Sequence, residues 1–119
     1  MSLTVPSFPN LFILYGPNAQ PRSGSFLSWI EVWSRYVAQA IVHLVEHGLR
    51  SVEVRRERYT EYNDELQVAS DKLIWAHEAP AGRNYYINEF GRQTVNYPWR
   101  NAEVFARLRA FNPRDFHLA

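Results

Sequence analysis

Two stretches of this sequence carry residues whose types and spacing could do chemistry. The first is a turn that runs from Gly16 to Ser25 and leads into a long apolar helix. Glycine lets a ligand approach the backbone closely, and the first amides of a helix have no partner within it. Such a turn can hold an anion or the polar edge of a cofactor. The same spacing also fits an ordinary strand-to-helix loop, and neither a GxGxxG pattern nor a Walker-type phosphate loop is present.

The second stretch, residues 43–47, reads His-Leu-Val-Glu-His and matches the HxxEH pattern of inverted zinc peptidases. His43 and His47 lie one helical turn apart, so their imidazoles could share one zinc ion. Against this, Gly48 ends the helix at once, and His47 also suits the helix dipole as a cation in the last turn. We therefore predict no metal site and no catalytic residue in this chain.

An apolar run at residues 11–15 comes directly before the turn, with Pro9-Asn10 on one side and Gly16-Pro17 on the other. A short apolar run between turn signals predicts a strand buried on both faces, which is typical of a parallel sheet covered by helices. The rest of the chain contains no second strand of this type. The strand has therefore either lost its sheet or borrows one from another copy.

Helical spacing predicts three helices. The first runs from about Ser25 to His47, and its wide apolar arc indicates burial against more than one layer. The second begins with Ser51 as its N-cap, and its charged side chains form a solvated face. The third covers about residues 99–111.

The chain breaks at residues 79–82, after which two short polar-apolar segments flank Gly91 in a predicted β-hairpin, residues 85–88 and 92–96. Aromatic clusters at residues 75–78 and 97–100 are interpreted as core packing. The predicted fold class is α+β, mostly α, with one N-terminal strand, three helices and a β-hairpin.

Composition excludes several classes of partner. The chain has 119 residues, a net charge of +1 and no cysteine. Its basic cluster at residues 55–58 is short and mixed in sign, so we expect no nucleic-acid partner. No uncharged run reaches membrane-spanning length, so we expect no membrane association and a cytoplasmic protein.

Further stretches match one family: Phe8-Pro9-Asn10-Leu11-Phe12 running into Tyr15-Gly16-Pro17-Asn18, Ser28-Trp29-Ile30-Glu31, Lys72-Leu73-Ile74-Trp75-Ala76-His77, Tyr85-Tyr86-Ile87-Asn88 and Asn96-Tyr97-Pro98-Trp99-Arg100. Together they resemble the C-terminal end of Baeyer–Villiger and related flavin-containing monooxygenases. The resemblance implies a fragment in three parts. Residues 1–7 are a leader, residues 8–48 hold the last FAD-domain strand and its helix, and residues 49–119 form a helix–hairpin–helix extension.

The resemblance also implies the activity. The parent would use FAD and NADPH to insert one O2-derived oxygen into a carbonyl compound or a soft heteroatom. The isolated chain would be inactive and bind neither cofactor, its partners being the missing N-terminal FAD and NADP domains and further copies of itself. The alternative is a non-catalytic helical module for interaction or dimerisation.

Two groups of site residues follow from the resemblance. The cofactor-binding group consists of the turn residues Gly16, Pro17 and Asn18 and of Ser25, Phe26 and Leu27, the first-turn positions of a helix whose start would lie by the pyrimidine side of the flavin ring. The substrate-pocket group is Arg22 and Ser23, at positions where many relatives carry glycine and histidine.

Overall fold

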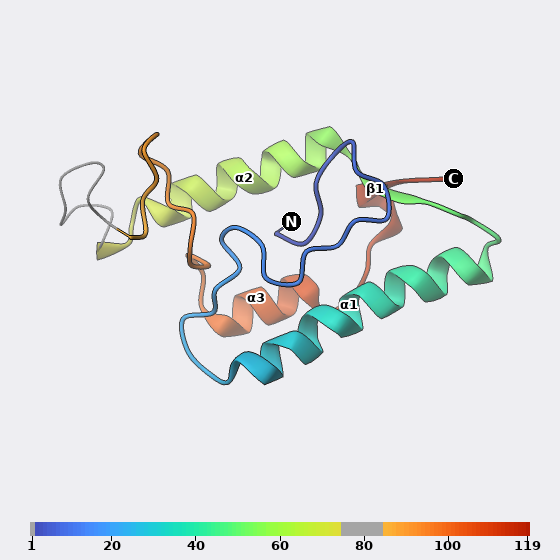
Figure 1. The fold of residues 1–119 in the computed structure, drawn as a ribbon, viewed down its shortest axis with the longest axis horizontal. Coiled ribbons are helices and arrows are strands. Elements are labelled where there is room, and N and C mark those ends of the chain that lie inside the picture. Colours follow the sequence, from blue (N-terminus) through green and yellow to red (C-terminus); the bar gives the residue numbers. More distant parts are fainter. Residues whose placement is uncertain (1, 75–84) are drawn as a thin grey trace.

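The elements surround an N-terminal segment that lies across the space between two long helices (Figure 1). The computed structural model describes residues 2–74 and 85–119. Within these ranges the order is α1 (Phe26–Glu46), β1 (Val52–Val54), α2 (Arg56–Ser70), α3 (Asn101–Leu108), the 3-10 turn η2 (Pro113–Asp115) and β2 (Phe116–Leu118). This order confirms a mostly helical α+β chain. The predicted break at residues 79–82 and the aromatic cluster at 75–78 lie outside the described residues.

Helix α1 forms where its spacing predicts, but the predicted burial against more than one layer is wrong for the described residues: one face is buried, while Leu27, Ile41 and Val45 are exposed. Buried side chains recur every three or four residues along one face, at Trp29, Trp33, Tyr36 and Ala40, which is the spacing of an amphipathic helix. The helix ends where predicted, because Gly48 takes a left-handed conformation with φ of 64°.

A two-stranded antiparallel sheet replaces the predicted start of the second helix. β1 pairs with β2, with Val52 opposite Leu118 and Val54 opposite Phe116. The prediction of Ser51 as an N-cap was wrong: α2 begins later and has Arg55 as its N-cap. Val52 and Val54 point into the core while Glu53 faces outward, so burial of alternate side chains favours a strand over a helical turn here.

The strand predicted at residues 11–15 does not form. The amide of Ile13 donates to the Leu3 carbonyl (2.8 Å), so this segment folds back on the chain's own N-terminus. Its partly buried side chains, Phe12 and Leu14, pack on the core, whereas Tyr15 is half exposed. The described part of the chain offers no parallel strand beside it, and an isolated strand cannot satisfy its backbone groups.

The predicted hairpin is present as a tight turn. Ile87 and Gln93 form an antiparallel bridge, and Gly91 has a φ of 74°, the left-handed conformation expected at that position. Helix α3, Asn101–Leu108, is shorter than the predicted helix of about residues 99–111. It starts after Arg100, whose amide donates to the Glu103 carboxylate (3.1 Å).

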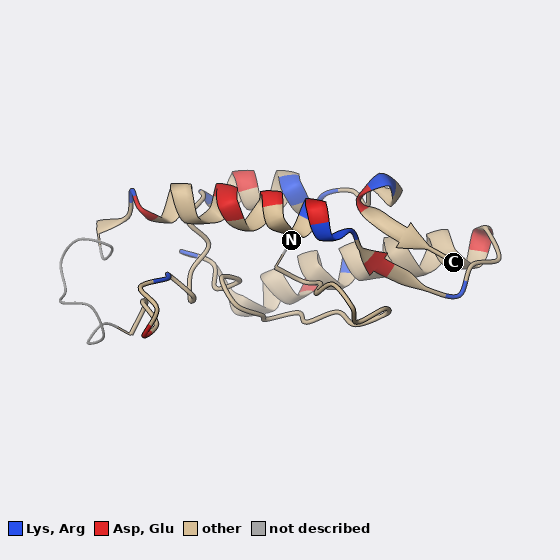
Figure 2. Ribbon diagram, turned by 90° about the horizontal axis from the view of Figure 1, so that it is seen from above, with Lys and Arg blue, Asp and Glu red and all other residues tan. Residues whose placement is uncertain are grey.

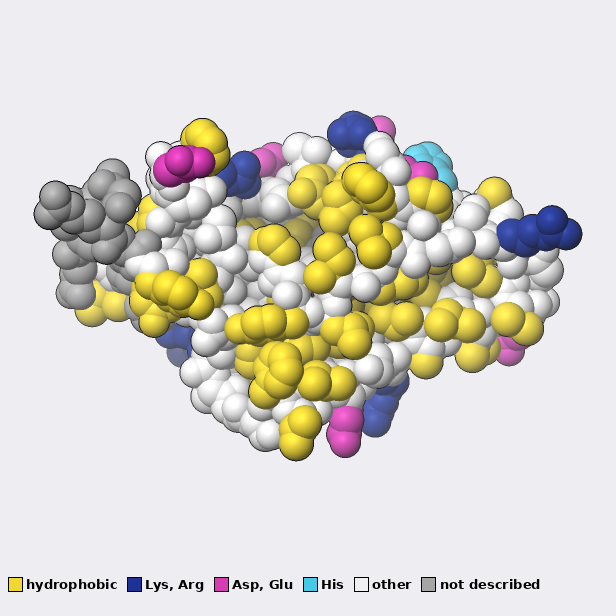
Figure 3. All heavy atoms as spheres, in the orientation of Figure 1, with side chains coloured by type: hydrophobic (Ala, Val, Ile, Leu, Met, Phe, Trp, Pro, Cys, Tyr) yellow, Lys and Arg dark blue, Asp and Glu magenta, His cyan; other side chains and the backbone are white. Residues whose placement is uncertain are grey.

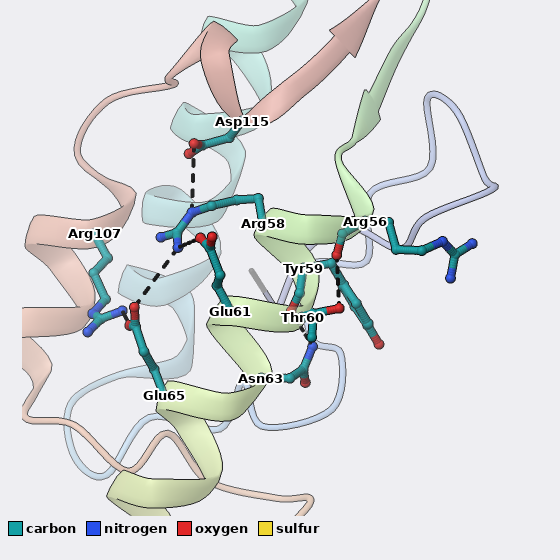
Figure 4. A network of polar contacts seen from close by, with 9 residues as sticks. All are labelled: Arg56, Arg58, Tyr59, Thr60, Glu61, Asn63, Glu65, Arg107 and Asp115. Atoms are coloured by element: carbon teal, nitrogen blue, oxygen red, sulfur yellow. Dashed lines mark hydrogen bonds and ion pairs between the residues drawn. The ribbon is translucent and has the colours of Figure 1, made fainter.

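The charged face of α2 is only partly solvated. Figure 2 shows acidic and basic residues concentrated along this helix. Arg58 contacts Glu61 on the same helix (3.2 Å) and Asp115 of η2 (3.7 Å), as Figure 4 shows. Arg107 of α3 donates to Glu65 (2.8 Å). These pairs are partly exposed, so each adds little stability, but together they fix α2 against α3 and η2.

Candidate functional site

The start of α1 is an open helix N-terminus. Ser25 has the extended conformation of an N-cap, but its side chain makes no capping hydrogen bond. Within the described residues, no hydrogen bond reaches the amides of residues 26–28. Ser25, Phe26 and Leu27 are all exposed, and Leu27 is 73% exposed. Three unpaired amides at the positive end of a helix dipole can bind an anion or a carbonyl oxygen.

An aromatic cluster supports this helix start from behind. The rings of Tyr15 and Phe26 meet edge to face with centroids 5.0 Å apart, and Phe26 in turn contacts Trp33 at 5.8 Å. Trp33 is fully buried, whereas Tyr15 and Phe26 each keep about half of their surface exposed. The helix start therefore combines polar amides with a flat apolar rim.

The turn residues play a structural part. A Cβ atom at Gly16 would lie 2.8 Å from the Ser2 carbonyl oxygen, so the close approach that glycine permits is to the chain's own backbone. Asn18 is buried and has a φ of 58°. Its side-chain amide donates to the backbone carbonyl of Gln93 (2.9 Å) and to the side-chain oxygen of the same residue. The turn is thereby fastened to the hairpin.

Backbone hydrogen bonds extend this connection. The amide of Gln20 donates to the Val95 carbonyl (3.1 Å), and the amide of Tyr97 donates to the Gln20 carbonyl (3.0 Å). Residues 18–20 therefore run alongside residues 94–97 and lead directly into the turn before α1. The hairpin, far away in sequence, fixes the path by which the chain enters the helix.

The two predicted substrate-pocket residues have different surroundings. Arg22 is exposed. Ser23 is tied to the start of α3, because the Asn101 side-chain amide donates to its carbonyl (2.8 Å) and to its hydroxyl (2.9 Å). Ser23 thus joins the two helix starts, and Arg22 is the freer of the pair.

The histidines of the HxxEH stretch interact with each other. Their ring centroids are 4.1 Å apart, and the Nδ1 atom of His47 lies 2.8 Å from the His43 carbonyl oxygen. A hydrogen bond at that nitrogen leaves one nitrogen of His47 for any other partner. In residues 2–74 and 85–119, no group of three or more His, Cys, Asp or Glu side chains is placed to hold a metal ion.

A polar groove lies between α2 and the hairpin, and no sequence motif indicated it. Its volume is about 380 Å³, and its walls come from the turn, α2 and the hairpin: Pro17, Asn18, Tyr59, Thr60, Asn63, Asp64, Gln67, Asn88, Arg92, Gln93 and Thr94. Thr60, Asn63, Asp64 and Gln67 have helical spacing on α2, and of these only Asp64 belongs to the charged face predicted from sequence. In the part of the chain that the structure describes, no helix is long and apolar enough to cross a membrane.

Several known proteins are similar in sequence to most or nearly all of this chain. An uncharacterized monooxygenase (y4iD) of Sinorhizobium fredii is 34% identical over 98% of the chain. A Baeyer-Villiger monooxygenase of Pseudomonas aeruginosa is 30% identical over 97% of it, and an FAD-binding monooxygenase (ktnD) of Aspergillus niger is 29% identical over 81%. The chain is homologous to a segment of flavin-dependent monooxygenases. No protein-family model matches it.

The monooxygenase relatives are much longer than this chain, which spans 17%, 22% and 16% of their respective lengths. The resemblance found in the sequence is therefore confirmed for a segment of such a monooxygenase. The cofactor and substrate positions predicted from that resemblance stay predictions.

Proposed function

We propose that this chain forms the C-terminal part of an FAD- and NADPH-dependent monooxygenase, which inserts one O2-derived oxygen into a carbonyl compound, as in a Baeyer–Villiger reaction, or into a soft heteroatom. The observation that carries the proposal is the 30% identity over 116 residues with the Pseudomonas aeruginosa enzyme. Activity would belong to the whole protein. The N-terminal FAD and NADP domains would supply the glycine-rich phosphate sites that this sequence lacks.

The open helix start fits one edge of a flavin. The amides of residues 26–28 are available as donors, and the apolar rim of Tyr15 and Phe26 lies beside them. A bound flavin would supply the redox and oxygen chemistry. This chain would donate hydrogen bonds to the polar edge of the ring, and its helix dipole would favour negative charge on the reduced ring. Arg22 and Ser23 would border the substrate.

The apolar surface of α1 suits burial against the rest of such an enzyme. Leu27, Ile41 and Val45 lie on a side of α1 turned away from its core face, and Val45 is 74% exposed. Figure 3 shows hydrophobic side chains spread over the face formed by the N-terminal segment and this helix. An exposed apolar patch larger than roughly a few hundred Å² is uncommon on a protein that acts alone. It also favours the second candidate function, a helical module that dimerises.

The isolated chain is expected to show no saturable binding of FAD at micromolar concentration, because its open helix start can hold only one edge of the ring and it has no phosphate-binding loop. Titration followed by flavin fluorescence measures this. We expect an in-frame coding region upstream of Met1, and the longer protein that it encodes should purify with bound FAD. Saturable FAD binding by the isolated chain, or a longer protein that purifies without flavin, would contradict the proposal.

The isolated chain is also expected to self-associate through the exposed side of α1. Burying about 400 Å² of apolar surface contributes roughly 10 kcal/mol before association costs of roughly 4–15 kcal/mol. Replacing Ile41 and Val45 together by Lys should weaken the association at least about tenfold, which corresponds to 1.4 kcal/mol. Sedimentation across a dilution series measures it.

The matched control places two lysines on exposed positions of α3, with Ala102→Lys and Ala106→Lys. This variant has the same added charge and should associate like the unchanged chain. A chain that stays monomeric at high concentration, or a control that dissociates equally, would show that the α1 surface is not the interface.

A further inference from the structure

The groove between α2 and the hairpin has walls of opposite hydrogen-bonding character. Its volume of about 380 Å³ is within the range of small-molecule sites. Its lining is mostly amide, hydroxyl and charged side chains rather than the apolar groups found in a core. This groove shares Pro17 and Asn18 with the turn but includes none of residues 25–28 at the open start of α1. The inference below does not depend on the proposed flavin function.

The hairpin wall presents donors. The side-chain oxygen of Asn88 accepts from the amides of Phe90 (3.1 Å) and Arg92 (2.9 Å), which leaves its NH2 group to donate outward. The Arg92 side chain is exposed and, among the described residues, pairs with no acid. Both side chains can therefore donate to an acceptor on a ligand.

Gln93 adds a donor that needs a partner. Its side chain is 4% exposed, and its oxygen already accepts from Asn18. Its nitrogen is buried and, in the described part of the chain, makes no hydrogen bond. A buried donor without an acceptor costs about 1–3 kcal/mol, so such groups are rare in native proteins. An acceptor held at the floor of the groove would remove this cost.

The α2 wall presents acceptors. The NH2 group of Asn63 donates to the Tyr59 carbonyl (2.8 Å), so its oxygen is left to accept. The hydroxyl of Thr60 donates to the Arg56 carbonyl (3.0 Å), which likewise leaves its oxygen lone pairs. Asp64 belongs to the same wall, and no ion pair or hydrogen bond involves its carboxylate within residues 2–74 and 85–119.

We propose that this groove binds a small zwitterion of the amino-acid class. The carboxylate of the ligand would lie toward Arg92 and the side-chain nitrogens of Asn88 and Gln93. Its ammonium group would lie toward Asp64 and the Asn63 oxygen. Opposite charges on the two walls recognise both ends of such a molecule at once, whereas a simple anion or cation satisfies only one wall.

The probe for this site is L-glutamine, whose carboxamide can also use the remaining polar positions of the groove. With ¹⁵N-labelled protein, the side-chain NH2 signals of Asn63, Asn88 and Gln93 report directly on the walls. We expect these signals to shift and saturate below about 10 mM L-glutamine, the affinity typical of a few charge-assisted hydrogen bonds. Acetate and ethylamine, each of which has one of the two charges, should produce no saturation in this range.

Two variants, each of which replaces one charged side chain by a neutral one, test whether Arg92 and Asp64 bind the ligand. Arg92→Gln and Asp64→Asn should each raise the apparent Kd at least about tenfold, because a hydrogen bond to a charged group contributes about 1.5–3 kcal/mol. Arg109→Gln and Glu31→Gln remove the same charges from exposed positions outside the groove and should bind L-glutamine like the unchanged chain.

Three results would overturn the proposal. The first is the absence of saturable shifts with L-glutamine. The second is equal saturation by acetate, ethylamine or glucose, which would show a site without zwitterion recognition. The third is unchanged affinity in Arg92→Gln and Asp64→Asn when the NH2 spectra show that both variants keep the native fold.

Discussion

The free energy of unfolding is expected to fall steeply as the pH rises above about 10, the ordinary pKa of tyrosine. Tyr36, Tyr62 and Tyr97 are buried, and burial is the largest cause that raises the pKa of each phenol in the folded chain. The Asp115 carboxylate raises the pKa of Tyr36 further, while the hydrogen bond between the hydroxyls of Ser2 and Tyr97 partly offsets the effect of burial on the pKa of Tyr97.

The sign follows from proton binding. Above pH 10 the unfolded chain releases these phenol protons, whereas the folded chain retains them until its higher pKa values are reached. Protons are then fewer in the unfolded state, so stability is fully present below pH 10 and is lost as pH rises. While a phenol proton is bound only in the folded chain, its group lowers the stability by up to about 1.4 kcal/mol per pH unit, so the three together lower it by up to about 4 kcal/mol per unit.

Urea unfolding followed by circular dichroism at several pH values measures this loss. The share of tyrosinate absorbance that belongs to the three buried phenols, out of seven tyrosines, should appear only with unfolding. Tyr62→Phe should reduce the slope with pH by about a third, because one of the three coupled protons is removed. Tyr85 is 79% exposed, so Tyr85→Phe should leave the slope unchanged. Formation of all seven tyrosinates while circular dichroism still reports a folded chain would contradict the expectation, because the three buried phenols would then titrate without unfolding.

Trp33→Ala is expected to lower the free energy of unfolding by about 3–5 kcal/mol, the usual cost of removing a fully buried large aromatic side chain. Trp33 has no exposed surface, and its ring contacts those of Tyr15 (6.1 Å between centroids) and Trp29 (6.3 Å). The substitution leaves a cavity exactly where the N-terminal segment rests on α1. The aromatic rim of the open helix start should lose its support at the same time.

Urea unfolding at low protein concentration measures the change, since dilution keeps self-association from adding stability. Phe90→Ala serves as the control, because Phe90 is at the tip of the hairpin and is 79% exposed. It should change the free energy by less than about 0.5 kcal/mol. A loss below about 1 kcal/mol for Trp33→Ala would mean that this contact region does not organise the core.

The sequence by itself determined the features that depend on neighbouring residues. Helix α1 and its end at Gly48 follow from side-chain spacing within one helix and from the conformational freedom of one glycine. The turn at Gly91 follows from the same local rule. The relationship to monooxygenases could also be predicted, because it rests on short stretches of residues that can be compared directly.

Only the tertiary structure decided the features that join distant segments. Val52 and Val54 form a strand because β2, at the other end of the chain, provides its hydrogen-bonding partner. The apolar residues 11–15 look like a strand, yet the nearest backbone partner that they find is Leu3. Strand identity depends on such pairing more than on local preference.

Of the candidate sites, one likewise depends on neighbouring residues and another on contacts between distant segments. The open start of α1 could be placed from sequence, since unpaired amides occur at every helix start. The role of Asn18 could not, because its partners Gln93 and Asn96 are in the hairpin. The polar groove also depended on the fold: its acceptors are on α2 and its donors are on the hairpin, and only tertiary packing sets these two walls opposite each other.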